Sequence, residues 1–186
     1  MKRRFPDDPG PWQVISSEYL HRKPWLTVRQ ERVRLPSGAE IPEYWVNEYP
    51  DWVNVVALTP SREVVLVRQY RHGLGAVHSE LPAGVVDPED ASAEAAARRE
   101  LSEETGYGGG RWRLLASLSQ NPALTSNLTH CFLAEDVEVT GAPKPEATED
   151  LRMSLVPLAD MAALVERGEM VQALHVAPIF QVLLGR

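Results

Sequence analysis

Three short runs, each rich in β-branched and aromatic residues, occupy the first fifty positions of the chain. Turn signals such as the Pro-Ser-Gly sequence at 36–38 separate them. This pattern predicts strands at 12–21, 26–35 and 40–49, joined as an antiparallel meander. We expect a proline-containing arm over 1–11 ahead of them. Because three strands seldom stand alone, the meander should pack on the next domain or on a second subunit.

Two longer apolar runs follow at 51–60 and 63–71, and their continuous apolar centres predict strands that are buried on both faces. Similar runs predict further strands at 111–119, 128–139 and 151–158. Strands therefore lie on both sides of helical segments without strict alternation, which favours a layered α+β or α/β domain.

The pattern changes to helix over 87–105, where four of the six residues at 91–96 are alanine, the best helix former. Gly106 supplies the C-terminal stop. Further helices are predicted at 159–169 and at 172–186. The candidate N-caps of the first helix are Asp87, Asp90 and Ser92. The second helix should end at Gly168, and Pro178 should mark a start or a kink in the third.

Composition limits the classes of function. The chain has 186 residues, 44% apolar and 24% charged, as in an ordinary soluble globular protein. Its net charge of -7 argues against general nucleic-acid binding but leaves a small phosphorylated ligand open. A single cysteine, Cys131, excludes an internal disulfide and fits a reducing compartment. No signal-peptide pattern and no apolar run long enough for a membrane span is present, so we expect a cytoplasmic protein.

Three glutamates gather near the carboxyl end of the first predicted helix: Glu100, Glu103 and Glu104. Carboxylates at this spacing repel one another, and the negative end of the helix dipole adds to the cost. Two interpretations compete. The first is a solvated acidic face, steadied by Arg98 and by an Arg99–Glu103 pair. The second is a site for a hard divalent cation, Mg²⁺ or Mn²⁺, which takes carboxylate oxygens.

The complete string resembles the second half of the Nudix box, the signature of the Nudix hydrolases. That half reads Arg-Glu-apolar-any-Glu-Glu-any-Gly-apolar, a pattern much more specific than a lone glycine motif. Its positions are filled here by Arg99, Glu100, Leu101, Glu103, Glu104, Gly106 and Tyr107.

The resemblance implies the fold of the family. We expect an α+β fold, an α/β/α sandwich with a mixed sheet between helices, preceded by an antiparallel three-stranded lobe. The expected division is 1–50 for the arm and meander and 51–186 for the catalytic domain. The resemblance also implies hydrolysis of a nucleoside diphosphate linked to another group.

The first half of the box departs from the family pattern. Counting back from Arg99, the position of a glutamate falls on Ala91, and Gly84 comes one residue too early. We interpret this as a one-residue insertion in the loop, with Asp90 or Glu89 in place of the missing acid. In the family that acid holds the helix and its arginine.

The resemblance also implies the metal ligands. Glu100 and Glu104 are expected as the principal ligands of Mg²⁺, with Mn²⁺ possible, and Glu103 as an assisting group. The SELPAG segment at 79–84 resembles the ADP-ribose pyrophosphatase branch of the family. In that branch a backbone carbonyl joins the metal shell, and here it belongs to Ala83.

Four residues are expected on the substrate side. The segment VRQYRHG resembles the same branch, in which the arginine at Arg71 contacts the diphosphate; the alternative is a surface arginine that ends a strand. Glu80 is an extra acid that either serves the site or pairs with Arg71. Arg99 is also expected to bind the substrate. Trp52 is the candidate for stacking on the base.

The tryptophans of the amino-terminal meander have an ordinary structural explanation, because a tryptophan most often belongs to a core or an interface. The meander is taken to include Trp25, Trp45 and Trp52. In the ADP-ribose branch, aromatic residues of this lobe stack on adenine, often across a swapped homodimer. The segment SQNPALTSN at 119–127 stands where those enzymes have a Gly-Tyr-rich acidic segment. This difference weakens the case for ADP-ribose as the substrate.

A base must take the proton of the attacking water. In the resembling enzymes it comes from a flexible acidic loop, which PEATEDLR at 145–152 matches. Glu149 aligns best and Glu146 second, and Glu103 is a third candidate. The alternative is a loop that is acidic for solubility. The histidines are interpreted as structural or surface residues without zinc-like spacing: His72, His78, His130 and His175.

The resulting hypothesis is a Mg²⁺-dependent homodimeric enzyme that hydrolyses the pyrophosphate bond of a nucleoside diphosphate sugar. ADP-ribose is favoured, and the products are a nucleoside monophosphate and a sugar phosphate. Another nucleotide sugar such as GDP-mannose, or a dinucleotide, is the alternative of the same class. A Nudix-fold sensor that binds without cleaving is the alternative of another class. Neither nucleic acid nor a membrane is an expected partner.

Overall fold

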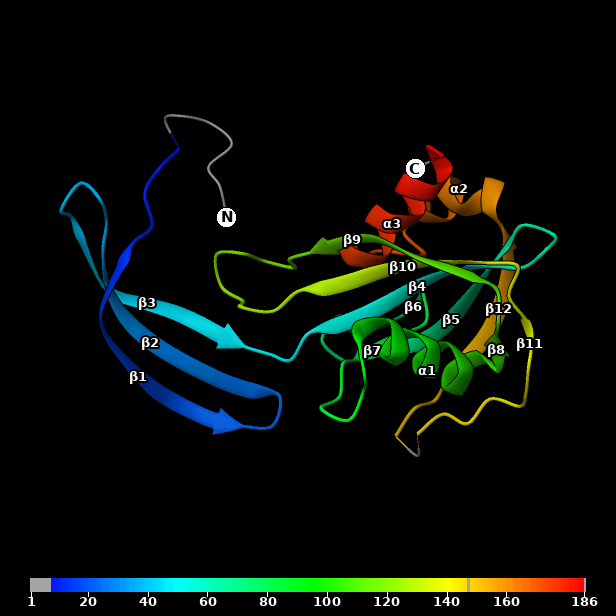
Figure 1. Cartoon of the computed structure of the whole chain (residues 1–186), viewed down its shortest axis with the longest axis horizontal. Helices are drawn as coiled ribbons and strands as arrows, with labels where there is room; N and C mark the ends of the chain where they lie inside the picture. Colours follow the sequence, from blue (N-terminus) through cyan, green and yellow to red (C-terminus); the bar gives the residue numbers. More distant parts are fainter. Residues whose placement is uncertain (1–7, 147, 186) are drawn as a thin grey trace. The chain divides into compact units, whose positions relative to one another are not determined.

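The computed structural model describes residues 8–146 and 148–185, and the chain forms two compact units (Figure 1). One unit comprises the residues up to Tyr49 together with Asn121–Asn127. The other comprises Pro50–Gln120 and the chain from Leu128 onward. The first seven residues of the expected arm lie outside the described residues.

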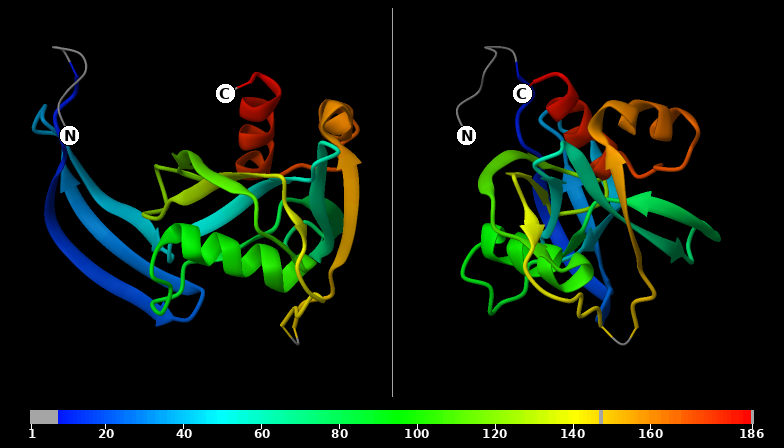
Figure 2. Two further views of the ribbon diagram at one scale, coloured as in Figure 1. Left: turned by 45° about the vertical axis from the view of Figure 1, so that its right-hand side comes forward. Right: turned by 90° about the vertical axis from the view of Figure 1, so that its right-hand side faces the viewer.

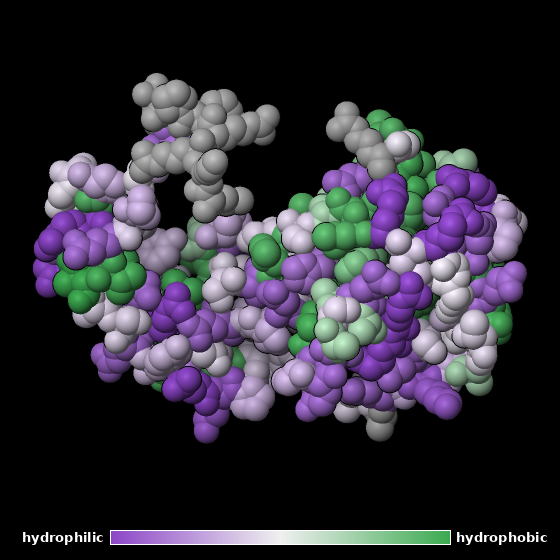
Figure 3. All heavy atoms as spheres, viewed as in Figure 1, coloured by the Kyte–Doolittle hydropathy of each residue, from purple (hydrophilic) through white to green (hydrophobic). Residues whose placement is uncertain are grey.

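The smaller unit is an antiparallel sheet in the order β1-β2-β3, so the predicted meander is confirmed. Its strands are β1 (Gln13–Lys23), β2 (Leu26–Arg34) and β3 (Glu40–Glu48). All of β1 is exposed, and apolar surface, green in Figure 3, covers part of this unit at the left. Arg32 and Arg34 of β2 both pair with Glu40. The segment 121–127 adds to β3 through the Asn47 N–H, which donates to Leu124.

The larger unit is built on a mixed sheet of seven strands in the order β12-β5-β4-β10-β9, with β6 paired to β5 and β7 to β4. The β4–β10 pair is parallel and the other pairs are antiparallel. These strands are β4 (Trp52–Leu58), β5 (Glu63–Arg71), β6 (Ala76–Glu80), β7 (Ala83–Val85), β9 (Arg111–Leu118), β10 (Thr129–Glu135) and β12 (Arg152–Pro157). A separate two-stranded ribbon pairs β8 (Tyr107–Gly108) with β11 (Glu138–Val139).

Helices cover both faces of this sheet, as Figure 2 shows: α1 lies on one face and α2 and α3 lie on the other. They are α1 (Ala93–Thr105), α2 (Met161–Glu166) with the 3₁₀ turn η1 (Leu158–Asp160) before it, and α3 (Ala173–Leu183). The layered α+β prediction, with a mixed sheet between helices, is therefore confirmed.

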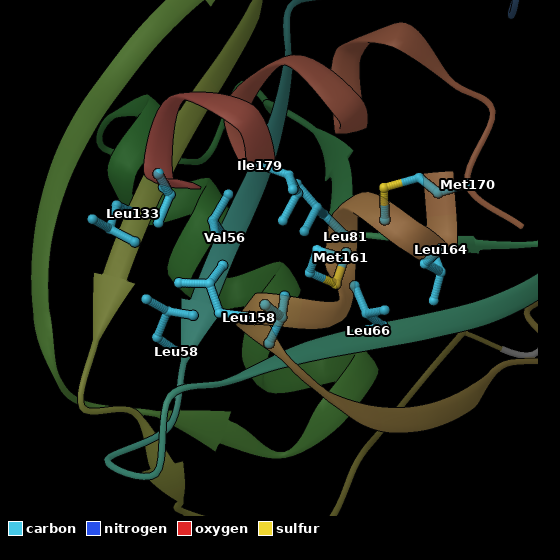
Figure 4. Packing of buried hydrophobic residues seen from close by; sticks show 12 residues of the cluster. Val56, Leu58, Leu66, Leu81, Leu133, Leu158, Met161, Leu164, Met170 and Ile179 are labelled. Carbon is cyan, nitrogen blue, oxygen red and sulfur yellow. The ribbon is translucent and has the colours of Figure 1, made fainter. Parts of the chain in front are cut away.

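Alternating side chains of β4 divide the core in two. Val53 and Val55 pack with α1 in one apolar cluster. Val56 and Leu58 face the other way and pack with Ile179 of α3, residues that Figure 4 labels. Every one of these valines is fully buried, as the continuous apolar run predicted. Because residues i and i+2 of a strand share a face, one strand serves both cores.

Several details of the prediction are wrong. Trp52 does not belong to the meander, because it begins β4 of the large sheet. The predicted strand 128–139 ends at Glu135, since Asp136 takes a left-handed backbone conformation with φ of 58°. Strands β6, β7 and β8 were not predicted, because they are too short to show a period. Pro178 does not start a helix; it lies inside α3 and is buried, and a kink there stays a prediction.

Helix α1 begins later than predicted. Residues 87–92 form a loop, and Ser92 rather than Asp87 or Asp90 is the N-cap. The Ser92 hydroxyl accepts a hydrogen bond from the Ala95 N–H at 3.1 Å. At the other end Gly106 is the C-cap with φ of 74°, as predicted from the sequence.

Replacing Ser92 by alanine should lower the free energy of unfolding by about 1 kcal/mol, because the Ala95 N–H loses its acceptor. Urea denaturation measures this. The control is Glu89→Ala in the same loop, which removes an exposed side chain and should stay within about 0.5 kcal/mol of wild type. Equal losses in the two variants would contradict the assignment of the cap.

Candidate active site

Arg99 holds the loop before α1 against the helix. Its Nε and Nη2 donate to the two carboxylate oxygens of Asp90 at 3.2 and 3.0 Å, and Nη2 also donates to the Val85 carbonyl. Nη1 donates to Glu100 at 2.8 Å and to Glu103 at 3.1 Å. The hydrogen bonds from Arg99 hold the pKa of the Asp90 carboxyl below its usual range.

Of the two acids proposed to replace the missing glutamate, Asp90 is therefore the one that bonds the helix arginine. Asp90 thus makes the link to the arginine that was expected of the missing glutamate. Arg99 was also expected on the substrate side. Its donors go to protein oxygens in this structure, and a contact with substrate stays a prediction.

Glu104 is a buried carboxylate that contacts the backbone of β7. Its side chain turns toward β7, and Oε2 accepts a hydrogen bond from the Ala83 N–H at 3.1 Å. Burial raises the pKa of Glu104 to about 8, and the nearby charges of Glu100 and Glu149 act in the same direction. A divalent cation beside this group would favour the charged form instead.

Glu100 lies one turn earlier on the same face of α1 and meets the next residue of β7. A Cβ atom built on Gly84 would overlap the Glu100 carboxylate, so glycine at this position lets the carboxylate reach the backbone. Burial raises the pKa of Glu100 as well. The carboxylates of Glu100 and Glu104 thus converge on the Ala83–Gly84 backbone.

Glu103 has a different environment. Its side chain is 45% exposed and pairs with Arg99 as the i, i+4 spacing predicted.

Across 8–146 and 148–185, no group of three or more His, Cys, Asp or Glu side chains surrounds a common point. The convergent donors are two carboxylates and the backbone of β7. This oxygen-rich set suits a hard cation that keeps water as its other ligands.

The second arginine of interest, Arg71, ends β5 and is clamped by Glu80. Nε donates to one carboxylate oxygen at 2.8 Å and Nη2 donates to the other. Glu80 is 2% exposed, and Gln69 also contacts it. The alternative in which Glu80 pairs with Arg71 is the one that the structure shows. The hydrogen bonds that Arg71 donates to Glu80 raise the pKa of Arg71, so the guanidinium stays positively charged.

Arg71 also borders a pocket of about 60 Å³ in the larger unit. Ala83 lines the same pocket, so the clamped arginine and the backbone beside Glu104 share one recess. Trp52 lines it too, whereas Trp25 and Trp45 belong to the smaller unit. The remaining lining residues are Val53, Asn54, Gln120, Thr129, Gln172, Leu174 and His175.

The acidic loop between β11 and β12 brings one of its two candidates to the site. Glu149 is half-buried, and its charge acts on Glu100, Glu104 and Arg71. Glu146 is exposed, and its backbone N–H donates to the Glu149 carboxylate at 2.9 Å. The structure therefore favours Glu149 over Glu146 as a group that faces the carboxylates of α1.

Two residues that line the pocket were not predicted from the sequence to belong to the site. His175 was read as structural or surface, and Asn54 was not singled out. Both are buried, and the Asn54 amide donates to the Leu174 carbonyl at 2.8 Å while its Oδ1 has no partner within the described ranges. A signal was present in the sequence: each is a polar residue inside an apolar run, where burying it costs free energy unless it is bonded.

Gly84→Ala should weaken divalent-cation binding about tenfold or more, because the new methyl group displaces the Glu100 carboxylate from the backbone. Calorimetric titration with Mn²⁺ and with Mg²⁺ measures this. Gly73→Ala is the matched control, since a Cβ there meets open space. Unchanged cation affinity in Gly84→Ala would show that Glu100 does not act at this backbone.

Acid should destabilise the protein through His175. Burial lowers its pKa from 6.5 to about 4; Glu80 opposes the shift and Arg71 adds to it. Between these pH values the unfolded chain binds a proton that the folded chain excludes. The contribution of His175 to the free energy of unfolding should therefore fall by about 3 kcal/mol as the pH falls from about 6.5 to about 4, whereas the raised pKa of Glu104 acts in the opposite direction.

Urea denaturation at a series of pH values measures this loss. His175→Leu has no titratable group at the position, so the free energy of unfolding of wild type should fall relative to that of this variant over the same interval. Parallel curves for the two proteins would mean that another group causes the acid sensitivity.

Comparison with known proteins identifies the family. The NUDIX domain model matches residues 48–174, and the model of the nucleoside diphosphate sugar hydrolase N-terminal domain matches residues 12–47. The chain is 32% identical over 172 residues to an ADP-ribose pyrophosphatase of Mycobacterium tuberculosis, covering 92% of this chain and 83% of that protein.

A GDP-mannose pyrophosphatase of Citrobacter koseri is 33% identical over 114 residues, covering 57% of this chain and 59% of that protein. A crystal structure of an ADP compounds hydrolase superposes with a TM-score of 0.83 at 25% identity, covering 95% of this chain and 94% of that one. The chain therefore belongs to the Nudix family, and its NUDIX domain follows the N-terminal domain of nucleoside diphosphate sugar hydrolases.

Proposed function

We propose that this Nudix hydrolase cleaves the pyrophosphate bond of a nucleoside diphosphate sugar, with ADP-ribose as the first substrate. The observation that carries the proposal is the placement of opposite charges around one pocket. The Glu100 and Glu104 carboxylates reach the backbone beside it, and the Arg71 guanidinium borders it. Such a site can hold a diphosphate between a cation and an arginine.

The fit to a divalent cation rests on the chemistry of the donors. Glu100, Glu104 and the Ala83 carbonyl would hold it, and Mg²⁺ is proposed because hard oxygen ligands suit it. The bound cation would neutralise charge on the phosphoryl oxygens and lower the pKa of water. Glu103, paired with Arg99, is proposed as an assisting group near the shell rather than as a principal ligand.

The chain supplies the other requirements of hydrolysis. Arg71, fixed by Glu80, is proposed to bind the diphosphate oxygens, because a planar guanidinium matches two oxygens at once. Glu149 is proposed to take the proton of the attacking water. Trp52 borders the pocket and is proposed to contact the base. Water attack on one phosphorus then releases a nucleoside monophosphate and a sugar phosphate.

The relatives support this class of substrate and leave its base and sugar open. An ADP-ribose pyrophosphatase and a GDP-mannose pyrophosphatase both resemble the chain, so GDP-mannose is the second candidate. A sensor that binds without cleaving is the third. The retained Glu100 and Glu104 argue against it, since binding alone needs no pair of repelling carboxylates on one helix face.

Three further properties belong to the proposal. A homodimer is proposed because the β1–β3 sheet presents exposed apolar residues such as Trp25 and Trp45, and its test is the mass in solution. A cytoplasmic location is proposed from the single buried cysteine, Cys131. Among the described residues, no helix is both long and apolar enough to span a bilayer.

A substrate panel tests the proposed function directly. Purified protein is incubated with ADP-ribose, GDP-mannose, other nucleotide sugars and dinucleotides, with Mg²⁺ or with a chelator. Released monoester is converted to phosphate by an added phosphatase and measured. We expect cation-dependent cleavage of at least one nucleotide sugar. Binding without cleavage across the whole panel would instead support the sensor.

Glu149→Gln should lower kcat for the substrate so identified by about 100-fold or more, because the amide cannot accept the proton of water. Glu146→Gln is the matched control in the same loop and should keep kcat within about twofold of wild type, since Glu146 is exposed. Steady-state kinetics at saturating Mg²⁺ measures both. Wild-type turnover in both variants would refute the assignment of the base to this loop.

A further inference from the structure

His175, in the first turn of α3, is buried although it is titratable, and both of its ring nitrogens face specific groups. Nδ1 accepts a hydrogen bond from the backbone N–H of Leu81 at 3.1 Å. Because Nδ1 accepts, the proton of the neutral ring is on Nε2. Nε2 lies 3.9 Å from Oε2 of Glu80. One imidazole ring thus faces the carboxylate of one residue and the backbone of the next.

Glu80 extends this contact to the pocket. Its two carboxylate oxygens receive Nε and Nη2 of Arg71, so the carboxylate and the guanidinium lie as a paired fork. Such a bidentate pair fixes orientation as well as distance. The orientation of Arg71 at the pocket therefore follows that of Glu80. Behind Glu80, on the side of α3, lies the imidazole of His175.

Leu81 begins a three-residue segment in which each residue bonds a different element. The Leu81 N–H donates to the imidazole on α3. The Pro82 carbonyl accepts from the Val55 N–H of β4 at 3.0 Å. The Ala83 N–H donates to Glu104 of α1 at 3.1 Å. The position of the Ala83 backbone beside the carboxylates thus depends on three anchors, and α3 supplies the first.

We propose that His175 is a positioning residue of the active site. From α3 it holds Glu80 and the Leu81 backbone, and through them it places Arg71 and Ala83. The inference rests on the proposed function, because Arg71 and Ala83 are the groups through which His175 acts on diphosphate and cation. The role requires an acceptor at the place of Nδ1, which an apolar side chain of the same size lacks.

The competing explanation is that His175 only fills space in the apolar core. Its own helix provides a control for that explanation. Ile179 of α3 is fully buried in the cluster that Figure 4 shows, and Ile179→Val removes one methylene group without removing a polar contact. If His175 only fills space, His175→Leu and Ile179→Val should both lower the stability of the protein, and neither should change the kinetic constants.

The test compares His175→Leu, His175→Asn and Ile179→Val with wild type as full-length proteins, at a temperature where circular dichroism shows each of them folded. The readouts are kcat and KM for the cleaved nucleotide sugar and the Mg²⁺ concentration for half-maximal rate. In His175→Leu we expect KM and the Mg²⁺ requirement to rise about tenfold or more. His175→Asn should recover most of the loss, because Oδ1 can accept near the place of Nδ1.

Ile179→Val should keep both constants within about twofold of wild type. Wild-type KM and Mg²⁺ requirement in folded His175→Leu would overturn the proposal, and so would an equal loss in Ile179→Val. If leucine prevents folding, His175→Gln takes its place, since its amide extends toward Glu80 and loses the Leu81 contact. Wild-type constants in that variant would equally overturn the proposal.

A binding measurement separates this inference from the proposed function. Calorimetric titration with ADP and Mg²⁺ does not require cleavage. Equal dissociation constants for wild type and His175→Leu would overturn the positioning role, whether or not a sugar is cleaved. Absence of turnover in wild type, with weaker ADP binding in His175→Leu, would refute the enzyme and keep the positioning role.

Discussion

The close approach of two α1 carboxylates to the backbone of β7 is the contact on which the site depends. Gly84 permits it, because any Cβ there would overlap Glu100. One residue earlier, the Ala83 N–H donates to Glu104. Glu104 is buried and Glu100 is partly buried, and burial raises the pKa of both carboxyls. A divalent cation beside them would favour the charged form of both instead.

The two arginines of the site show how differently one residue type can be used. Arg99 lies at the base of the helix, and its donors hold Asp90, Val85 and neighbouring glutamates. Arg71 is held by Glu80 at the border of the pocket. The first keeps a loop and a helix together. The second is oriented before any ligand binds, and at a site proposed for a diphosphate this would reduce the entropy lost on binding.

The glutamates of the acidic helix have two different environments. Glu103 and Arg99 form the i, i+4 pair of a partly solvated face. Glu100 and Glu104, on the neighbouring stripe of the helix, turn toward β7. Spacing along a helix specifies which side chains are neighbours, but it does not specify which stripe meets another element. The packing of α1 on the sheet places the stripe with Glu100 and Glu104 against β7.

The meander, the buried central strands, the main helices and the family could all be predicted from the sequence, because they depend on local propensity, on runs of apolar residues and on a long fixed motif. The sequence also pointed to Glu100, Glu104 and Arg71. The tertiary structure alone decided which acid bonds Arg99, which loop glutamate faces the helix, and that His175 lies behind Glu80. The physical reason is that these contacts join residues far apart in the chain. Their geometry follows from the packing of α1 and α3 on opposite faces of one sheet, which no local pattern records.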